Sequence, residues 1–494
     1  MILAALLLNA VFNFGIGLVT AHYLGPDEFG RFALAVALAV AVQVIVFDWI
    51  RLAAIRFYSD ETRRGAPDVR ATLDAGYLVA AGVLACGGLA AFASSAFGSL
   101  SPALFGLALI TAVINGAFDY STGLLRASFR DRLYARLVIV KNVLALVLTV
   151  GGAVLFRSAP MAIVGGVLSL GGAVALLRAS LADKGSGVRA ASWPLARTYL
   201  GYAAPIVVAN LLYLLIPLAN RAIVTRLFGF AETGQFSLAW DFGQRALQAI
   251  GTALDVVLFQ IAVAVHARDG LQAARRQASK NLGMVIALLL PATLGLWLVL
   301  PSIEALVVPL EFRGPFGRYL TLLLPGLFAL SIGSYGINPV FQIEKKTLAL
   351  ILAALVGCAG TPLFLLFMPA AQDASPDASG LALAQSAAYG AATLVLLGFA
   401  AVHAGLRPPP ARDLLAALGG SAALVLTGLP ARALPPGVET LALQIALGGL
   451  VYAGVAALAD LGGLRTALMA RLRRMDEALG PAPLRRAFTG RRGC

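Results

Sequence analysis

Ionisable side chains lie inside apolar segments of this chain that are long enough to cross a membrane. The densest series lies in the segment 236–262, where polar residues recur every three or four positions on one helical face: Asp241, Arg245, Gln248, Thr252 and Asp255. One charge at the centre of a bilayer costs at least ~2.5–3.5 kcal/mol on insertion scales, so three charges facing lipid would cost roughly 7–10 kcal/mol. This face is therefore expected to meet water or other polar groups.

Other apolar segments carry milder polar faces. Asn9 and Asn13 are four residues apart in the first segment, and Asn115 and Asp119 are four apart in another. Further polar residues of this kind include Lys141, Asn210, Arg221 and Asn338. Any one such face is also compatible with polar packing between helices. Several of them in both halves of the chain favour a hydrated central cavity.

The cations differ in how deeply they lie in these segments. Arg221 and Arg245 are far from the ends of their segments, so their side chains cannot easily reach the membrane surface. Arg51 and Arg56 lie at the cytoplasmic end of the segment 31–55, where they serve either as topology signals or in contact with a substrate. The deep cations are therefore the stronger candidates for a function inside the membrane.

Enzymatic chemistry finds no support in the sequence. There is no HExxH, P-loop, CxxC or GxSxG motif with its partner residues. The histidines, His22, His266 and His403, are scattered over loops and segment ends and cannot form a metal site together. We therefore expect no enzyme activity, no catalytic residues, no metal and no cofactor.

The elements that position these residues are transmembrane helices. Hydrophobic residues make up 60% of the chain and charged residues 13%, which excludes a soluble globular protein. Runs of ~20 apolar residues, each able to span ~30 Å of hydrocarbon, predict an all-α polytopic membrane protein. About fourteen spans are expected, at 1–21, 31–55, 72–96, 102–125, 135–156, 160–180, 198–225, 236–262, 281–300, 319–342, 347–369, 380–404, 412–430 and 440–460.

Lys and Arg are distributed asymmetrically between alternate loops. Loops that follow even-numbered spans hold twenty-one of them and loops that follow odd-numbered spans hold six, the C-terminal tail excluded. This asymmetry predicts a multi-pass protein with both termini in the cytoplasm. The net charge of +14 therefore reflects topology, and no nucleic-acid partner is expected.

One short stretch occurs twice, 204 positions apart. LGPDEFGRFALA, which starts at Leu24, is matched by FGFAETGQFSLA, which starts at Phe228. The recurring residues are Gly25, Glu28, Gly30, Phe32, Leu34 and Ala35, matched by Gly229, Glu232, Gly234, Phe236, Leu238 and Ala239. Each copy is interpreted as a tight turn at the membrane surface, in which glycine allows the chain to reverse and glutamate lies near the next helix N-terminus. Because six spans separate the copies, they predict two parallel six-helix lobes around a central cavity.

The expected domain organisation follows from this repeat. It comprises an N-terminal lobe at 1–180, a polar cytoplasmic linker at 181–197, a C-terminal lobe at 198–404, two further transmembrane helices at 405–460 and a cytoplasmic tail at 461–494. In the tail, leucines on one helical face and arginines around them predict a basic amphipathic helix on the membrane lipid.

The fourteen spans, the repeat and the turn motif YLGPDEFGRFALA resemble the oligosaccharide flippases of the multidrug/oligosaccharidyl-lipid/polysaccharide (MOP) exporter superfamily. This resemblance covers nearly the whole chain. It implies a MATE-like fold in a bacterial cytoplasmic (inner) membrane. It also implies alternating-access transport of undecaprenyl-diphosphate-linked oligosaccharides to the periplasmic leaflet, for synthesis of O-antigen, capsule or exopolysaccharide. Polysaccharide polymerase or assembly proteins are the implied partners.

Under this resemblance the cations would hold the dianionic diphosphate of the lipid-linked glycan. The candidates are Arg245, Arg221, Lys141, Arg51 and Arg56. Asp241, one helical turn from Arg245, either pairs with it or binds a coupling cation. The other candidates for cavity polarity or ion coupling are Asp255, Asp119, Asn115, Gln248, Asn338 and Asn210. Family members often carry a basic residue in the first span, and this sequence has none there.

Two other functions remain open. A MATE-type cation-coupled drug antiporter shares the expected architecture, and Asp241, Asp255 and Asp119 would then be its proton or sodium sites. The mixed charges and the turn motif favour the flippase over this antiporter. A membrane glycan polymerase or glycosyltransferase would need sizeable external loops with carboxylates or arginines, and the expected loops are short.

Overall fold

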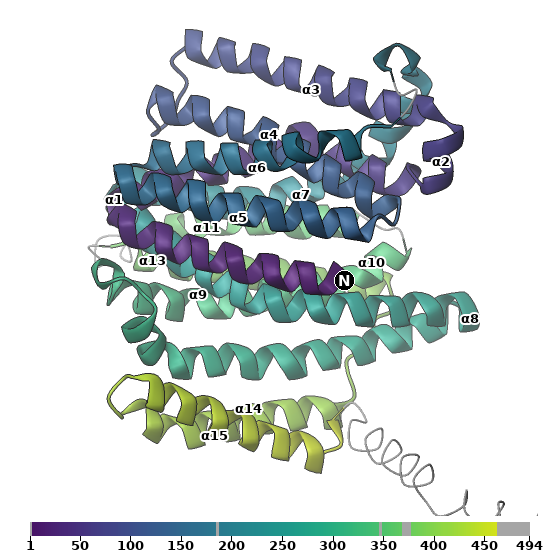
Figure 1. The fold of residues 1–494 in the computed structure, drawn as a ribbon. Coiled ribbons are helices and arrows are strands. Elements are labelled where there is room, and N and C mark those ends of the chain that lie inside the picture. Colours follow the sequence, from purple (N-terminus) through teal and green to yellow (C-terminus); the bar gives the residue numbers. More distant parts are fainter. Residues whose placement is uncertain (1, 184–186, 345–347, 368–376, 462–494) are drawn as a thin grey trace, which may run out of the picture. The chain divides into compact units, whose positions relative to one another are not determined.

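The computed structural model describes residues 2–183, 187–344, 348–367 and 377–461, and these residues form helices joined by short connections, with no strand among them (Figure 1). The α-helices are α1 Ile2–Phe57, α2 Asp60–Gly65, α3 Pro67–Ala93, α4 Pro102–Ala127, α5 Asp131–Phe156, α6 Ala159–Leu181, α7 Trp193–Phe228, α8 Phe230–Leu306, α9 Pro315–Ser331, α10 Asn338–Glu344, α11 Leu348–Phe367, α13 Ser379–His403, α14 Ala411–Arg432 and α15 Val438–Leu458. Three further short helices are η1 Val188–Ala190, η2 Leu310–Phe312 and the π-helical η3 Ile332–Ile337. The all-α fold expected from the sequence is confirmed.

Glycine interrupts the two longest helices. Gly25 in α1 has a φ of 69° and Gly270 in α8 has a φ of 80°, a backbone region that favours glycine because it has no Cβ. Each of these helices therefore consists of two helical segments. Among the described residues, eleven helices are long and apolar enough to cross a membrane, and one shorter apolar helix covers Leu348–Leu363. The protein is thus a multi-pass membrane protein, and the count of fourteen spans stays a prediction.

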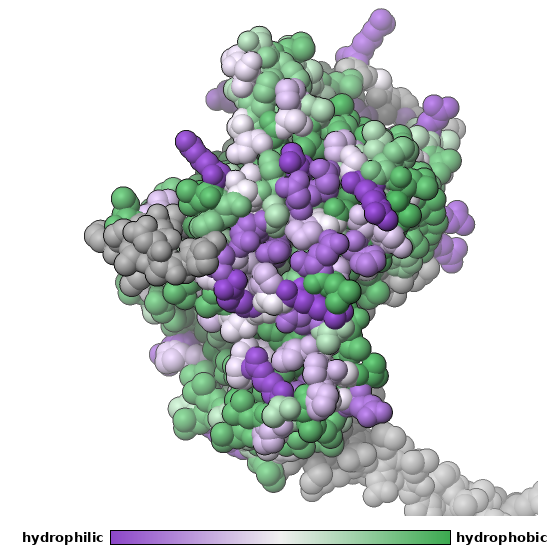
Figure 2. Space-filling model, turned by 90° about the vertical axis from the view of Figure 1, so that its left-hand side faces the viewer, coloured by the Kyte–Doolittle hydropathy of each residue, from purple (hydrophilic) through white to green (hydrophobic). Residues whose placement is uncertain are grey.

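Large hydrophobic side chains are exposed on many of these helices, as expected where helix flanks contact acyl chains. On α3, for example, Leu78, Val79, Val83 and Leu89 are each more than half exposed. Figure 2 shows that hydrophilic side chains gather in the middle of the face in view, with hydrophobic side chains around them. This distribution agrees with apolar flanks in the membrane and polar helix ends in water.

The described residues pack as two compact units. The first is drawn from Met1–Val256 and Ile303–Gly405, and the second from Val257–Ser302 and Leu406–Cys494. In the second unit, the Tyr452 hydroxyl donates a hydrogen bond to the carbonyl oxygen of Ala287, which joins α15 to α8. The first unit contains residues of both expected lobes, but the lobe boundaries at 180 and 404 stay predictions. The predicted tail helix lies outside the described residues.

The two copies of the repeated turn contact each other through their second glycines. A Cβ added to Gly30 would lie 2.9 Å from the backbone nitrogen of Gly234 and would clash with the backbone of Phe230. A Cβ added to Gly234 would lie 3.0 Å from the backbone nitrogen of Gly30 and would clash with the backbone of Pro26. The contact is reciprocal, as expected for two related lobes, and only glycine allows this approach.

The repeated glutamates also have equivalent structural roles. The Glu28 carboxylate accepts a hydrogen bond from the backbone nitrogen of Ala159, 2.7 Å away, at the first residue of α6. The Glu232 carboxylate accepts one from Ala378, 3.2 Å away, at the residue that precedes α13. Each glutamate therefore caps the helix expected to be the last of its lobe, in addition to lying in the first turn of its own helical segment.

The expected linker between the lobes is anchored where it begins. The Asp183 side chain is only 4% exposed and accepts a hydrogen bond from the Tyr58 hydroxyl. It also pairs with Arg63 at 3.4 Å and with Arg70 at 3.1 Å. Burial raises the pKa of Tyr58 above its ordinary value, and the hydrogen bond to Asp183 raises it further. The start of the expected linker is thus held by charged and polar groups of Tyr58, Arg63 and Arg70.

Candidate functional site

In the described part of the first unit, two of the cavities are lined by residues from both halves of the chain. We name the cavity of about 240 Å³ the cationic chamber. Its walls are mostly apolar, and its polar residues include Asn13, Asn115, Lys141, Arg221, Asp241 and Arg245. We name the cavity of about 470 Å³ the polar chamber. It is lined by Gln43, Asp48, Arg51, Asp119, Asn210, Tyr213, Trp240, Gln244, Gln248, Ser331, Ser334, Tyr335 and Asn338, among others.

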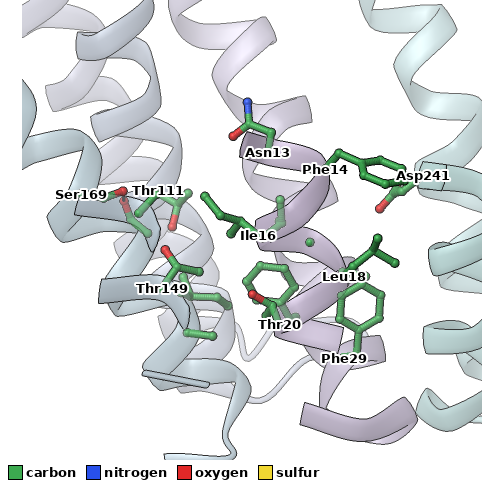
Figure 3. Close-up of a pocket in the computed structure, with 18 of the residues that line it drawn as sticks. Asn13, Phe14, Ile16, Leu18, Thr20, Phe29, Thr111, Thr149, Ser169 and Asp241 are labelled. Atoms are coloured by element: carbon green, nitrogen blue, oxygen red, sulfur yellow. Dashed lines mark hydrogen bonds between the residues drawn. The ribbon is translucent and has the colours of Figure 1, made fainter. Parts of the chain in front are cut away.

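The first segment of α1, which ends at Gly25, lines the cationic chamber. Figure 3 shows Thr111, Thr149 and Ser169 facing this segment from one side and Asp241 lying on its other side. The three hydroxyl residues belong to α4, α5 and α6, whereas Asp241 belongs to α8. The first segment of α1 therefore lies between polar groups from the two halves of the chain.

Lys141 of α5 brings a cation against α1. Its Nζ donates to the side-chain oxygen of Asn13 at 2.8 Å, of Asn142 at 2.9 Å and of Asn9 at 3.4 Å. These amide oxygens stabilise the ammonium group without neutralising its charge. The first span has no basic residue of its own, and the structure supplies a cation at that place from α5.

Arg221 forms an ion pair that links α7 to α8. Its Nη2 lies 2.5 Å from Oδ1 of Asp241, and its Nη1 donates to the carbonyl oxygen of Ala33 in α1 at 3.3 Å. The Arg221 side chain is 8% exposed. Asp241 thus pairs with Arg221 from the neighbouring helix, and not with Arg245 as the one-turn spacing had suggested. The pair leaves little net charge at this point of the chamber.

Arg245 is the other cation of the chamber. Its guanidinium donates to the carbonyl oxygen of Asn13, the residue whose side chain also accepts from Lys141. Among the described residues, neither Lys141 nor Arg245 forms an ion pair with a carboxylate. Two uncompensated positive charges therefore converge on Asn13. This residue belongs to the polar face expected in the first span, and the spacing of that face does not reveal its contact with both cations.

The polar chamber has a different charge balance. Arg51 Nε lies 2.5 Å from Oδ1 of Asp48, whose side chain is 3% exposed, so these two charges compensate each other. The Asp119 carboxylate accepts a hydrogen bond from Gln43 Nε2 at 2.9 Å and has no ion pair within the described part of the chain. The chamber therefore keeps one uncompensated negative charge. Sequence reasoning missed Gln43 and Asp48, although both are polar residues in the apolar segment 31–55.

The structure brings most of the candidate residues to one of the two chambers. Those that line the cationic chamber are Lys141, Arg221, Arg245, Asp241 and Asn115. Those that line the polar chamber are Arg51, Asp119, Gln248, Asn338 and Asn210. Arg56 is exposed on α1, and Asp255 lies further along α8 than the residues of either chamber. No group of three or more potential metal ligands occurs among the described residues.

A family model described as "Polysaccharide biosynthesis protein" matches residues 19–307, which is more than half of the chain. The chain belongs to this family. Its fold is similar to that of the lipid II flippase MurJ in an inward closed conformation, with a TM-score of 0.70 and 14% identity over 92% of this chain and 98% of that one. It is also similar to an inward-facing multidrug resistance MATE family transporter of the MOP superfamily, with a TM-score of 0.52 and 16% identity over 81% of this chain and 94% of that one. A search of curated proteins found no match.

The family match places the chain in a polysaccharide biosynthesis family, and the structural matches confirm the MATE-like fold that the sequence suggested. At 14–16% identity the two structural matches show the fold alone. This protein of the polysaccharide biosynthesis family therefore has a MurJ- and MATE-like helical fold with two chambers of different charge.

Proposed function

We propose that this protein is a flippase that moves undecaprenyl-diphosphate-linked oligosaccharide repeat units from the cytoplasmic to the periplasmic leaflet by alternating access. The translocated repeat units would be used in the synthesis of O-antigen, capsule or exopolysaccharide. The family and the fold shared with a lipid II flippase support this proposal. The observation that carries it is the convergence of Lys141 and Arg245 on Asn13 without a carboxylate partner.

Lys141 is half-buried and Arg245 is exposed, and both line the same cavity without a carboxylate partner. A cavity that holds two such cations is suited to an anionic ligand. A diphosphate diester carries two negative charges and several acceptor oxygens, which match an ammonium and a guanidinium group. We assign the diphosphate to Lys141 and Arg245. The ion pair between the buried Arg221 and the partly exposed Asp241 would instead fix the positions of α7, α8 and α1 around the ligand.

The polar chamber offers hydrogen-bond partners for the glycan. Each sugar hydroxyl that loses water without gaining a partner costs several kcal/mol, so a glycan cannot cross hydrocarbon unaided. A cavity of about 470 Å³ lined by amides, hydroxyls and tyrosines offers replacement hydrogen bonds. The two chambers together would accommodate both parts of a lipid-linked glycan.

The remaining assignments follow from this function. The protein would lie in a bacterial cytoplasmic membrane with both termini in the cytoplasm, and would act as a transporter without enzymatic activity. Its partners would be the lipid-linked glycan, the surrounding membrane lipid and the polymerase or assembly proteins that consume the translocated glycan. Arg51 and Arg56 would meet the substrate where it enters from the cytoplasm.

A cation-coupled drug antiporter is the second candidate, because the fold is shared with a MATE family transporter. The observation in its favour is the Asp119 carboxylate, which lines the polar chamber without an ion pair. The uncompensated charges in the cationic chamber are positive, however, and would repel a cationic drug. The charge balance therefore favours the flippase.

Complementation of a flippase-null strain tests the proposal. Each charge-assisted hydrogen bond to a phosphate contributes about 1.5–3 kcal/mol, so Lys141→Gln and Arg245→Gln should each reduce transport about tenfold to a hundredfold at matched expression. Arg178→Gln, which removes an exposed cation near the end of α6, is the matched control and should complement as the wild type does. Full complementation by both chamber variants would show that the diphosphate assignment is wrong.

A further inference from the structure

We propose that the polar chamber receives the sugars next to the diphosphate and selects repeat units in which these sugars are neutral or carry an amine, against those that carry a carboxylate. This inference rests on the proposed function, which assigns the diphosphate to the cationic chamber. It adds a statement about the chemical class of the glycan.

The two chambers differ in net charge once their ion pairs are cancelled. In the cationic chamber the Arg221–Asp241 pair compensates itself, and Lys141 and Arg245 remain. In the polar chamber the Arg51–Asp48 pair compensates itself, and Asp119 remains. The uncompensated charges are therefore two positive in one chamber and one negative in the other.

The acceptors of the polar chamber reinforce this preference. Asp119 accepts from Gln43 through one carboxylate oxygen only, so its other oxygen remains able to accept from a ligand. Oδ1 of Asn338, which lines the same chamber, is buried and has no hydrogen-bond partner. Both atoms need donors, and sugar hydroxyl or ammonium groups provide them. A sugar carboxylate would place a third acceptor beside them and would leave all three less well satisfied.

The chambers are close enough for one molecule to occupy both. On α8, Arg245 lines the cationic chamber and Gln248 lines the polar chamber. Three residues along a helix correspond to a rise of about 4.5 Å. On α4, Asn115 and Asp119 line the cationic and the polar chamber in turn, with a rise of about 6 Å between them. A sugar bonded directly to a diphosphate spans such a distance, so the sugars nearest the lipid are those that meet Asp119.

The test compares four lipids in binding to the full-length protein in nanodiscs. Three are polyprenyl-diphosphate disaccharides that differ only in the proximal sugar, which is glucose, glucosamine with a free amine, or glucuronic acid. The fourth is polyprenyl diphosphate without sugar. The wild type should bind the glucose and glucosamine lipids about tenfold or more tightly than the glucuronic acid lipid, because like charges at close range in a cavity repel strongly.

Two carboxylate variants test whether Asp119 causes the preference for the glucose and glucosamine lipids. Asp119→Asn should bring the affinity for the glucuronic acid lipid to within about threefold of that for the glucose lipid. Asp131→Asn, which changes a carboxylate in the first turn of α5 that lines neither chamber, should keep the wild-type preference.

The outcomes separate this inference from the proposed function. Equal binding of the three disaccharide lipids by the wild type would overturn the inference, and so would an unchanged preference in Asp119→Asn. The proposed flippase function would still stand in either case if polyprenyl diphosphate binds and Arg245→Gln weakens that binding. Failure of polyprenyl diphosphate to bind would overturn the proposed function, and the inference with it.

Discussion

The contact between the repeated turns predicts that a single methyl group at Gly30 changes how the two turns meet. In the structure, a Cβ at this position would lie 2.9 Å from the backbone nitrogen of Gly234 and even nearer to the backbone of Phe230. Backbone atoms cannot rotate away as a side chain does, so the turns must separate. Overpacking of this kind costs about 1–3 kcal/mol, which corresponds to a shift of roughly 5- to 150-fold in the equilibrium between closed and separated turns.

The variants Gly30→Ala, Gly234→Ala and the double variant make this reasoning quantitative. Because one separation of the turns relieves both clashes, the double variant should lose clearly less than the sum of the two single losses in thermal stability. Gly15→Ala is the control, since a Cβ at Gly15 would have no atom within 4 Å. That variant should be neutral or slightly stabilising, because alanine favours helix more than glycine does.

The rate at which a reagent reaches the cationic chamber measures the separation of the two turns. Thr20 lines the cationic chamber and is 1% exposed (Figure 3). With Thr20→Cys as the only cysteine, in nanodiscs that leave both faces accessible, Gly30→Ala should raise the rate of maleimide labelling about tenfold. Unchanged labelling together with fully additive stability losses would refute the close packing of the turns.

Three further predictions concern the interactions that hold the lobes. Glu28→Gln and Glu232→Gln should each lower stability by about 1 kcal/mol, seen as similar decreases in melting temperature, because each carboxylate caps one helix; clearly unequal decreases would argue against equivalent roles. Arg221→Met should cost about 3–5 kcal/mol by leaving Asp241 unpaired, and Arg221→Met combined with Asp241→Leu should regain most of that loss; a double variant as unstable as the single one would contradict this account of the pair. The raised pKa of Tyr58 means that its hydrogen bond contributes fully below its unfolded-state pKa near 10 and is lost as pH rises through the higher folded-state pKa. The stability difference between the wild type and Tyr58→Phe should therefore stay constant up to about pH 9 and shrink at higher pH, and a difference that already shrinks below neutral pH would be inconsistent with it.

The sequence predicted the fold because bilayer physics leaves few alternatives. Long apolar segments must be helices, and the recurrence of Gly30 and Glu28 at Gly234 and Glu232 indicated two related lobes. What those residues do could not be read from the chain. The reciprocal contact of the glycines and the capping of helices more than a hundred residues away depend on how distant segments pack.

The sequence predicted which residues form the candidate site, but not which side chains they contact. Helical periodicity identified Asp241 and Arg245 as residues of one polar face, because spacing along one helix is local information. The partner of Asp241 is Arg221 on the neighbouring helix, and the cation against the first span comes from Lys141. Side-chain partners from other helices depend on their order and rotation in the bundle, which the periodicity of a single segment does not encode.

Direct measurement of lipid flipping tests the central claim. Proteoliposomes that contain the purified protein and a fluorescent polyprenyl-diphosphate disaccharide with neutral sugars would be sampled with a membrane-impermeant quencher to follow movement between leaflets. We predict movement by the wild type and by Arg178→Gln, and movement reduced to the protein-free rate by Lys141→Gln combined with Arg245→Gln. Wild-type movement no faster than in protein-free liposomes, or undiminished movement in the double variant, would contradict the account.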